Sequence, residues 1–145
     1  MRMIYCERKT MDADLRWLQR LQNLNKAYAR LVTACAQEHY NDLELAGLVQ
    51  TYEFTFELAW KTLKDLLTYQ GYTVNSPRET IKLAFTEGLI TDAEEWLRAM
   101  ETRNLFAHTY EEQLSEEATR LIRAHFFPML SAVTEKLNEL AARHE

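Results

Sequence analysis

Hydrophobic residues recur at steps of three and four along most of the chain, which is the spacing of one face of an α-helix. The first run predicts a helix over about residues 12–38, after an irregular lead-in over residues 1–11. The second run, over about residues 43–69, is the most apolar. Phe54 and Leu58 lie off its main stripe, so this helix is expected to be covered on more than one side.

Capping signals set the ends of the next elements. Asn41 or Asp42 is expected to cap the second helix, and Gly71 to end it. The sequence SPRE at residues 76–79 places a capping Ser before a Pro, the favoured order at a helix start. It predicts a short third helix that ends before Gly88.

Two further helices complete the pattern. The sequence TDAE at residues 91–94 resembles a capping box and opens the fourth helix. A last helix is expected over residues 115–143, with Pro128 inside it. A proline in a helix interior removes one hydrogen bond and clashes with the preceding turn, so a kink or break is expected there.

Composition agrees with an all-helical fold. The 145 residues contain three Gly and two Pro, too few for many turns, and 47% are hydrophobic. The prediction is a single all-α domain over residues 1–145: an up-and-down bundle of four long antiparallel helices plus one short helix. With no long apolar run and no signal-peptide pattern, a soluble cytoplasmic protein that does not enter a membrane is expected.

Charge and cysteine spacing exclude several classes of function. The net charge of −5 argues against a general nucleic-acid coat, which needs many basic phosphate contacts, but allows a local basic site. Cys6 and Cys35 lack the spacing of metal ligands, so no metal is expected. No phosphate-binding glycine loop is present in the sequence either, and no cofactor is expected.

The fourth predicted helix carries the main candidate site, the sequence RNLFAHTY at residues 103–110. Continuing the apolar stripe of this helix places polar side chains where core residues are expected: Arg103, Asn104 and His108. An unpartnered buried amide alone costs roughly 2–7 kcal/mol. These residues therefore either have dedicated partners or line a cleft or subunit interface.

Helical geometry limits how this site can be assembled. Arg103 and His108 lie about 140° apart on an ideal helix, so one regular helix cannot direct both at one point. Asn104 and His108 can touch, and Arg103 and Tyr110 are nearly eclipsed. A shared site needs a helix break or a second copy of the chain, as a two-fold dimer provides.

No metal ligands accompany these residues in the sequence, so any phosphodiester cleavage by them would be metal-free and would need an RNA 2′-hydroxyl as nucleophile. In such a cleft His108 can serve as general base or acid, Arg103 can bind a phosphate, and Asn104 can orient the histidine. A structural interpretation stays open beside this one: Arg103 pairs with a carboxylate such as Glu57 or Glu101, and His108 is a satisfied core residue. The aromatic group of the second helix, Tyr52 to Trp60, is expected to be core.

At residues 103–110 the sequence resembles the R-x4-H-x-Y motif of the HEPN superfamily. The wider chain is similar to one branch of it, the nucleotidyltransferase substrate-binding protein family. The matching segments include FTFELAWK at residues 54–61, SPR at 76–78 and residues 96–110. Their order and spacing match as well, and the resemblance covers about residues 12–140.

The resemblance implies a homodimer and a partner, a minimal nucleotidyltransferase encoded by a neighbouring gene. In one account the helical chain is a toxin, an endoribonuclease that uses Arg103 and His108 with Asn104 in support. The nucleotidyltransferase then silences it by transferring AMP to Tyr110. In the other account the chain is a non-catalytic subunit that binds substrate for the nucleotidyltransferase. A dimeric scaffold without activity is a third possibility from the residues alone.

Overall fold

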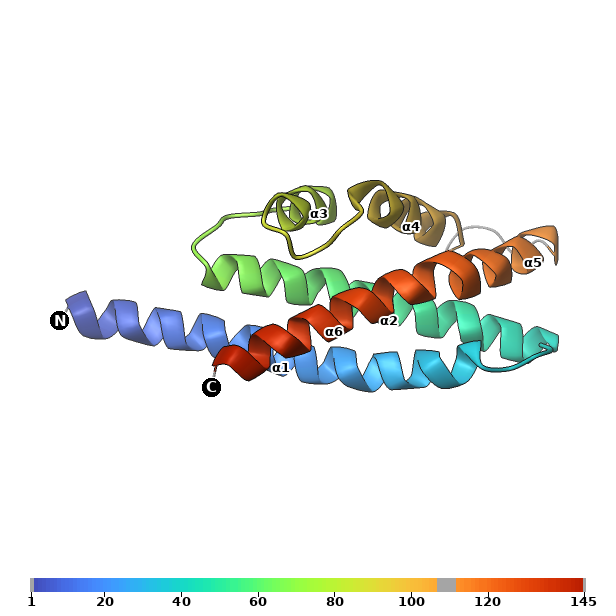
Figure 1. Ribbon diagram of the computed structural model, residues 1–145, viewed down its shortest axis with the longest axis horizontal. Coiled ribbons are helices and arrows are strands. Elements are labelled where there is room, and N and C mark those ends of the chain that lie inside the picture. The colour runs from blue at the N-terminus through green and yellow to red at the C-terminus, as the bar shows by residue number, and fades with distance from the viewer. Residues whose placement is uncertain (1, 107–111, 145) are drawn as a thin grey trace.

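The computed structural model describes the backbone of residues 2–106 and 112–144, and the side chains of residues 12–104, 106 and 116–143. Within these residues the chain is all-helical, as predicted (Figure 1). The elements in order are α1 (Arg2–Cys35), α2 (Asp42–Tyr69), α3 (Pro77–Thr86), α4 (Ala93–Phe106), α5 (Glu112–Leu121), the π-helical turn η1 (Ile122–Phe126) and α6 (Phe127–His144).

The first helix is longer than predicted. Helix α1 begins at Arg2 and ends at Cys35, so the irregular lead-in expected over residues 1–11 is wrong. This segment contains neither Gly nor Pro and is rich in Met, Arg, Glu and Lys, which have high helix propensity. Nothing in it stops a helix from extending toward the N-terminus.

The predicted caps of α2 and α3 are confirmed. Asn41 accepts a hydrogen bond from the backbone N–H of Glu44 at 2.8 Å, and Glu44 accepts one from Asn41 N–H at 3.0 Å. Gly71 adopts a φ of +101° just after α2. Ser76 caps α3 through the N–H of Glu79, and Gly88 follows α3 with a φ of +77°. Both glycines occupy left-handed conformations that other residues rarely adopt.

Helix α4 starts one residue later than the predicted pattern. The cap is Asp92 rather than Thr91, because the carboxylate of Asp92 accepts a hydrogen bond from Glu95 N–H at 3.0 Å. Either residue type suits this position. The sequence therefore located this helix start to within one residue.

The kink expected at Pro128 is accommodated by a π-turn. Residues Ile122–Phe126 form η1, and the N–H of Phe127 donates to the carbonyl of Ile122, five residues back. Pro128 cannot donate and would crowd the carbonyl four residues before it in a regular α-helix. The wider turn directly before Pro128 lets α5 and α6 follow each other without a break in the chain path.

The arrangement of the long helices differs from the predicted up-and-down bundle. Tyr28 of α1 bonds Ser131 of α6, and Asn25 bonds Asn138, so α6 runs antiparallel to α1. Helix α2 also runs antiparallel to α1, so α2 and α6 point the same way (Figure 1). Helices α3 and α4 are short, and in this view they are seen close to end-on. They lie across the long helices and return the chain to the end of the molecule at which α2 begins, where α5 starts (Figure 1).

The core lies between α1, α2 and the η1–α6 segment and extends under α4. Its largest fully buried side chains include Trp17, Tyr52, Phe56, Trp96 and Phe126. Tyr52 stacks on Phe126 with ring centroids 5.4 Å apart, and Phe56 packs against Trp96 at 5.6 Å. The prediction that the aromatic residues of α2 are core is confirmed for Tyr52, Phe56 and Trp60.

Phe54 departs from that prediction. Its side chain is 56% exposed, whereas Leu58 on the same helix is buried. Helix α4 packs against α2 at Tyr52, Phe56 and Glu57, and the Phe54 side chain stays exposed within this same stretch. Among the described residues, no helix has the length and apolar character needed to cross a membrane.

Candidate functional site

Helix α4 presents Arg103 toward α2. Among the described side chains of α4, the buried ones are Trp96, Ala99 and Phe106, and Arg103 falls on the stripe that they form. The hydroxyl of Tyr52 donates to the carbonyl of Ala99 at 2.9 Å and fixes α4 against α2. This contact lies one helical turn before Arg103. The arginine is therefore placed by a packed helix and has a half-buried side chain, 30% exposed.

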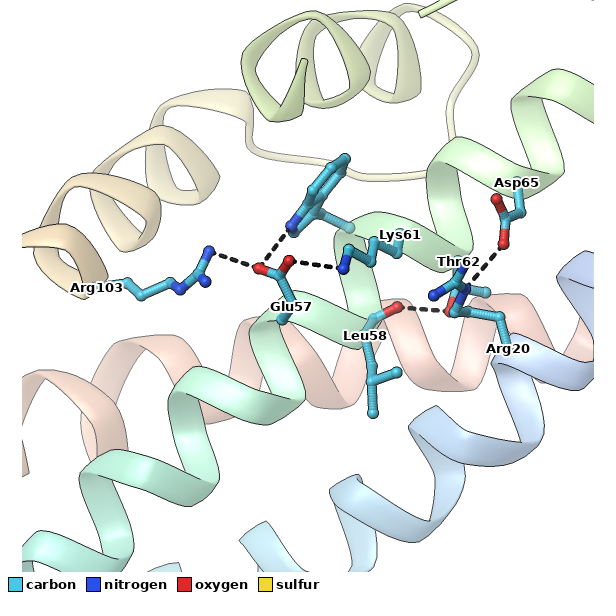
Figure 2. A network of polar contacts seen from close by, with 8 residues as sticks. Arg20, Glu57, Leu58, Lys61, Thr62, Asp65 and Arg103 are labelled. Carbon is cyan, nitrogen blue, oxygen red and sulfur yellow. Dashed lines mark hydrogen bonds and ion pairs between the residues drawn. The ribbon is translucent and has the colours of Figure 1, made fainter. Parts of the chain in front are cut away.

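The partner of Arg103 is Glu57 of α2. Arg103 Nη1 lies 2.6 Å from Glu57 Oε2, and Lys61 Nζ lies 3.0 Å from Glu57 Oε1. The indole N–H of Trp60 also donates to Glu57 Oε2 at 3.0 Å. Figure 2 shows the carboxylate between the two cations, with Arg103 reaching it from α4 and Lys61 from α2.

The surroundings of Glu57 favour its ionised form. Burial by itself raises the pKa of this carboxyl, but hydrogen bonds from Trp60 and Lys61, with the charge of Arg103, outweigh burial and lower the pKa below its usual value. Glu57 is therefore an anion at neutral pH. It holds two cations, and the three charges leave one net positive charge.

A neighbouring carboxylate behaves in the opposite way. Burial raises the pKa of Glu53, one turn earlier on α2, and the charge of Arg103 only partly offsets this effect. Burial likewise raises the pKa of the Tyr52 phenol, again opposed by Arg103. The charge of Arg103 thus acts to lower the pKa of several groups of α2, and Glu57 is the group among them with an ion pair to Arg103.

The predicted site residues have different outcomes. Arg103 lies on the inner face of α4 with a dedicated carboxylate partner, one of the two arrangements that the sequence allowed. Asn104 is exposed, so its expected place on the apolar stripe is wrong. The cause is the stripe itself, which runs through Ala99 and Phe106 and leaves Asn104 outside. His108 and Tyr110 lie outside the described residues.

Sequence reasoning found the parts of this network but not their assembly. The four-residue spacing of Glu57 and Lys61 along one helix allows their ion pair, and Glu57 was one of two carboxylates considered for Arg103. The contribution of Trp60 was missed, because the residue was assigned to the core. Its three-residue spacing from Glu57 was the available signal.

An open groove lies apart from this network, between the start of α4 and α6. Its volume is about 680 Å³, and its lining includes Glu95, His125, Pro128 and Lys136. His125 Nδ1 lies 3.8 Å from Glu95 Oε1, and both side chains are partly exposed. His125 is thus a surface residue. Among the residues whose side chains are described, no three His, Cys, Asp or Glu are placed to hold a metal ion.

Fold and site together define the class of protein: an all-helical domain whose transverse helix places an arginine against a carboxylate on a long core helix. A family described as "nucleotidyltransferase substrate binding protein like" matches residues 19–139. The match covers most of the chain, so the chain belongs to this family, a branch of the HEPN superfamily.

Individual relatives agree with this assignment. The "Probable ribonuclease HepT" of Haemophilus influenzae is 29% identical over 77 residues, which are 50% of this chain and 53% of the relative. The chain thus matches about half the length of that curated relative.

Two solved structures share the fold. A protein of Thermus thermophilus, ttk003001694, has a TM-score of 0.69 and 30% identity, with 81% of this chain and 97% of that chain covered. The Haemophilus influenzae protein HI0074 has a TM-score of 0.74 and 24% identity, with 81% and 98% covered. HI0074 is described as revealing the fold of a substrate-binding domain of a nucleotidyltransferase.

Proposed function

We propose that this protein is the HEPN-type toxin of a toxin–antitoxin pair, a metal-independent endoribonuclease that a minimal nucleotidyltransferase neutralises by transferring AMP to Tyr110. The observation that carries the proposal is the placement of Arg103: a half-buried cation of the R-x4-H-x-Y segment, fixed on α2 by Glu57. The name of the Haemophilus ribonuclease relative supports the same class of activity.

The proposed reaction uses the RNA itself as nucleophile. His108 takes the proton of a ribose 2′-hydroxyl, the 2′-oxygen attacks the adjacent phosphorus, and the bond from phosphorus to the 5′-oxygen breaks. The leaving 5′-oxygen takes up a proton, and the products are a 2′,3′-cyclic phosphate and a 5′-hydroxyl. Arg103 stabilises the negative charge that grows on the phosphate oxygens.

Neutralisation follows from the position of Tyr110 in the motif. The tyrosine hydroxyl attacks the α-phosphorus of ATP bound to the nucleotidyltransferase, and pyrophosphate leaves. On a regular helix Tyr110 and Arg103 are nearly eclipsed. The AMP phosphate would then occupy the position at which Arg103 binds RNA, and cleavage would stop.

The proposal includes a homodimer. On one regular helix Arg103 and His108 would lie about 140° apart, so a second copy is expected to complete each site. The exposed Phe54 lies close along α2 to Glu57 and supports an interface on this face.

The test is RNA cleavage by the purified chain in EDTA, followed by detection of cyclic-phosphate ends. We expect Arg103→Ala and His108→Ala to reduce cleavage by at least about a hundredfold. Arg98→Ala removes an exposed arginine from the same helix and should leave cleavage unchanged. Absence of cleavage by the unmodified wild-type chain would refute the ribonuclease proposal.

A second candidate function is a non-catalytic substrate-binding subunit of a two-component nucleotidyltransferase, which the description of the family favours. Intact mass after co-expression with the neighbouring gene separates the two. A gain of AMP units that disappears in Tyr110→Phe supports the toxin. A stable complex with unmodified mass, active on a third molecule only when this chain is present, supports the binding subunit.

A further inference from the structure

Two cations from different helices share one carboxylate, and one of the two is the proposed catalytic arginine. Glu57 contacts Lys61 through one oxygen and Arg103 through the other, at 3.0 and 2.6 Å (Figure 2). The exposed fractions are 38% for the Lys61 side chain and 30% for the Arg103 side chain. Both cations are therefore anchored and still accessible to a ligand.

The cluster keeps unused capacity for an anion. A guanidinium carries five N–H donors and an ammonium carries three, so one carboxylate cannot occupy them all. The charges of Glu57, Lys61 and Arg103 sum to +1, and the neighbouring carboxyl of Glu53, one turn earlier on α2, opposes part of this positive charge. A second anion that lies against both cations is therefore attracted, while Glu57 keeps them from swinging into solvent.

The cluster is also rigid on its inner side. Trp60, which is 8% exposed, fixes the carboxylate of Glu57 through its indole N–H. The contact of Phe56 with Trp96 and the Tyr52 hydrogen bond hold α2 against α4. Because these anchors belong to the core, the positions of the two cations are set before any ligand binds.

We propose that Lys61 and Arg103 form a two-cation site for the phosphodiester backbone of single-stranded RNA, with Lys61 as a phosphate-binding residue and Glu57 as a positioning residue for both cations. This inference rests on the proposed ribonuclease function and adds Lys61 and Glu57 to it. Lys61 neutralises a phosphate oxygen, and Glu57 holds the guanidinium of Arg103 in the orientation that the reaction needs.

The first experiment measures RNA binding apart from cleavage. Binding of a single-stranded RNA oligonucleotide is followed by fluorescence anisotropy at several salt concentrations, in a His108→Ala background. We expect Lys61→Gln to weaken binding about fivefold and to lower the slope of log affinity against log salt by about 0.7, the value for one phosphate contact. Lys136→Gln on α6 also removes one positive charge, and it should change neither the RNA affinity nor the salt slope.

The second experiment tests the positioning role of Glu57. Steady-state cleavage by Glu57→Gln should show kcat reduced at least about tenfold and KM raised by a smaller factor, since the substitution releases both cations from their positioning carboxylate but removes neither cation. A merely structural role would lower the thermal midpoint and leave kcat of the folded protein unchanged, so that result would overturn the assignment. The thermal midpoint of each variant is measured alongside.

The outcomes separate this inference from the proposed function. If the wild type cleaves no RNA but its binding depends on Lys61 as described, the ribonuclease proposal fails and the phosphate role of Lys61 stands. If cleavage depends on Arg103 and His108 while Lys61→Gln binds and cleaves like the wild type, the phosphate role of Lys61 is wrong. A chain that binds no RNA overturns the two-cation site.

Discussion

Glu57 connects α2 with α4 through its contacts with Arg103 of α4 and with Trp60 and Lys61 of its own helix. The two contacts within α2 follow from the three- and four-residue spacings along one helix. The contact with Arg103 joins residues far apart in the chain. The sequence offered Glu57 and Glu101 as alternatives for it, and the packing of α4 against α2 selects Glu57.

The lowered pKa of Glu57 makes its contribution to stability dependent on pH. A carboxyl whose folded-state pKa is depressed stabilises the protein above its unfolded-state pKa, and this contribution is lost as pH falls through the folded-state pKa. At pH 7 we expect Glu57→Gln to lower the free energy of unfolding by about 0.5–1 kcal/mol, because the group is partly exposed.

Urea unfolding of both proteins between pH 7 and pH 3 measures this effect. The difference in the free energy of unfolding between wild type and Glu57→Gln should be largest at neutral pH. It should shrink as the pH falls below 4.5, the ordinary pKa of Glu. A difference that stays constant across this range would contradict the ionic role of Glu57. Glu116→Gln, on an exposed position of α5, serves as the control.

Helix starts and ends were predicted well because the interactions that fix them are local. Asn41, Ser76 and Asp92 each accept a hydrogen bond from a backbone N–H three residues ahead. The start of α1 was missed because its first residues carry no cap signal and no breaker. The π-turn before Pro128 was predicted only as a kink or break. The proline shows where the helical hydrogen bonds are disturbed, but not which backbone conformation replaces them.

The cap of α2 gives a prediction at this scale. Asn41→Ala removes both the side-chain acceptor for Glu44 N–H and the reciprocal capping arrangement. We expect a loss of about 1 kcal/mol in the free energy of unfolding, measured by urea titration. Asn41→Ser retains a side-chain acceptor and should lie within a few tenths of a kcal/mol of the wild type; equal losses in both variants would show that capping is not the cause.

In the described part of the molecule the long helical stretches are α1, α2 and the α5–α6 segment, and the last two run in the same direction (Figure 1). Because α4 crosses the long helices, it places Arg103 against Glu57 near the middle of α2, and Phe54 of the same helix is exposed. In the proposed dimer, a second copy of the chain covers this exposed phenyl ring.

The proposed dimer is tested through Phe54. Sedimentation equilibrium should show a dimer of the wild-type chain, and Phe54→Ser should raise the dissociation constant at least about tenfold, because two phenyl rings are lost from a two-fold interface. Phe85→Ser on α3 removes a ring of similar exposure, 49% against 56%, and should leave the dimer intact. A wild-type monomer, or equal effects of both substitutions, would contradict the interface on α2.

The sequence by itself determined the helical class, most helix boundaries, the family and the candidate residues of the R-x4-H-x-Y segment. These features depend on periodicity, capping and motif spacing, which act within a few residues of one another. Only the tertiary structure decided that α2 and α6 run in the same direction, that Phe54 is exposed and that Glu57 is the partner of Arg103. Those outcomes depend on how separate helices cross and pack, and this is set by the fit of whole helix surfaces rather than by any local signal.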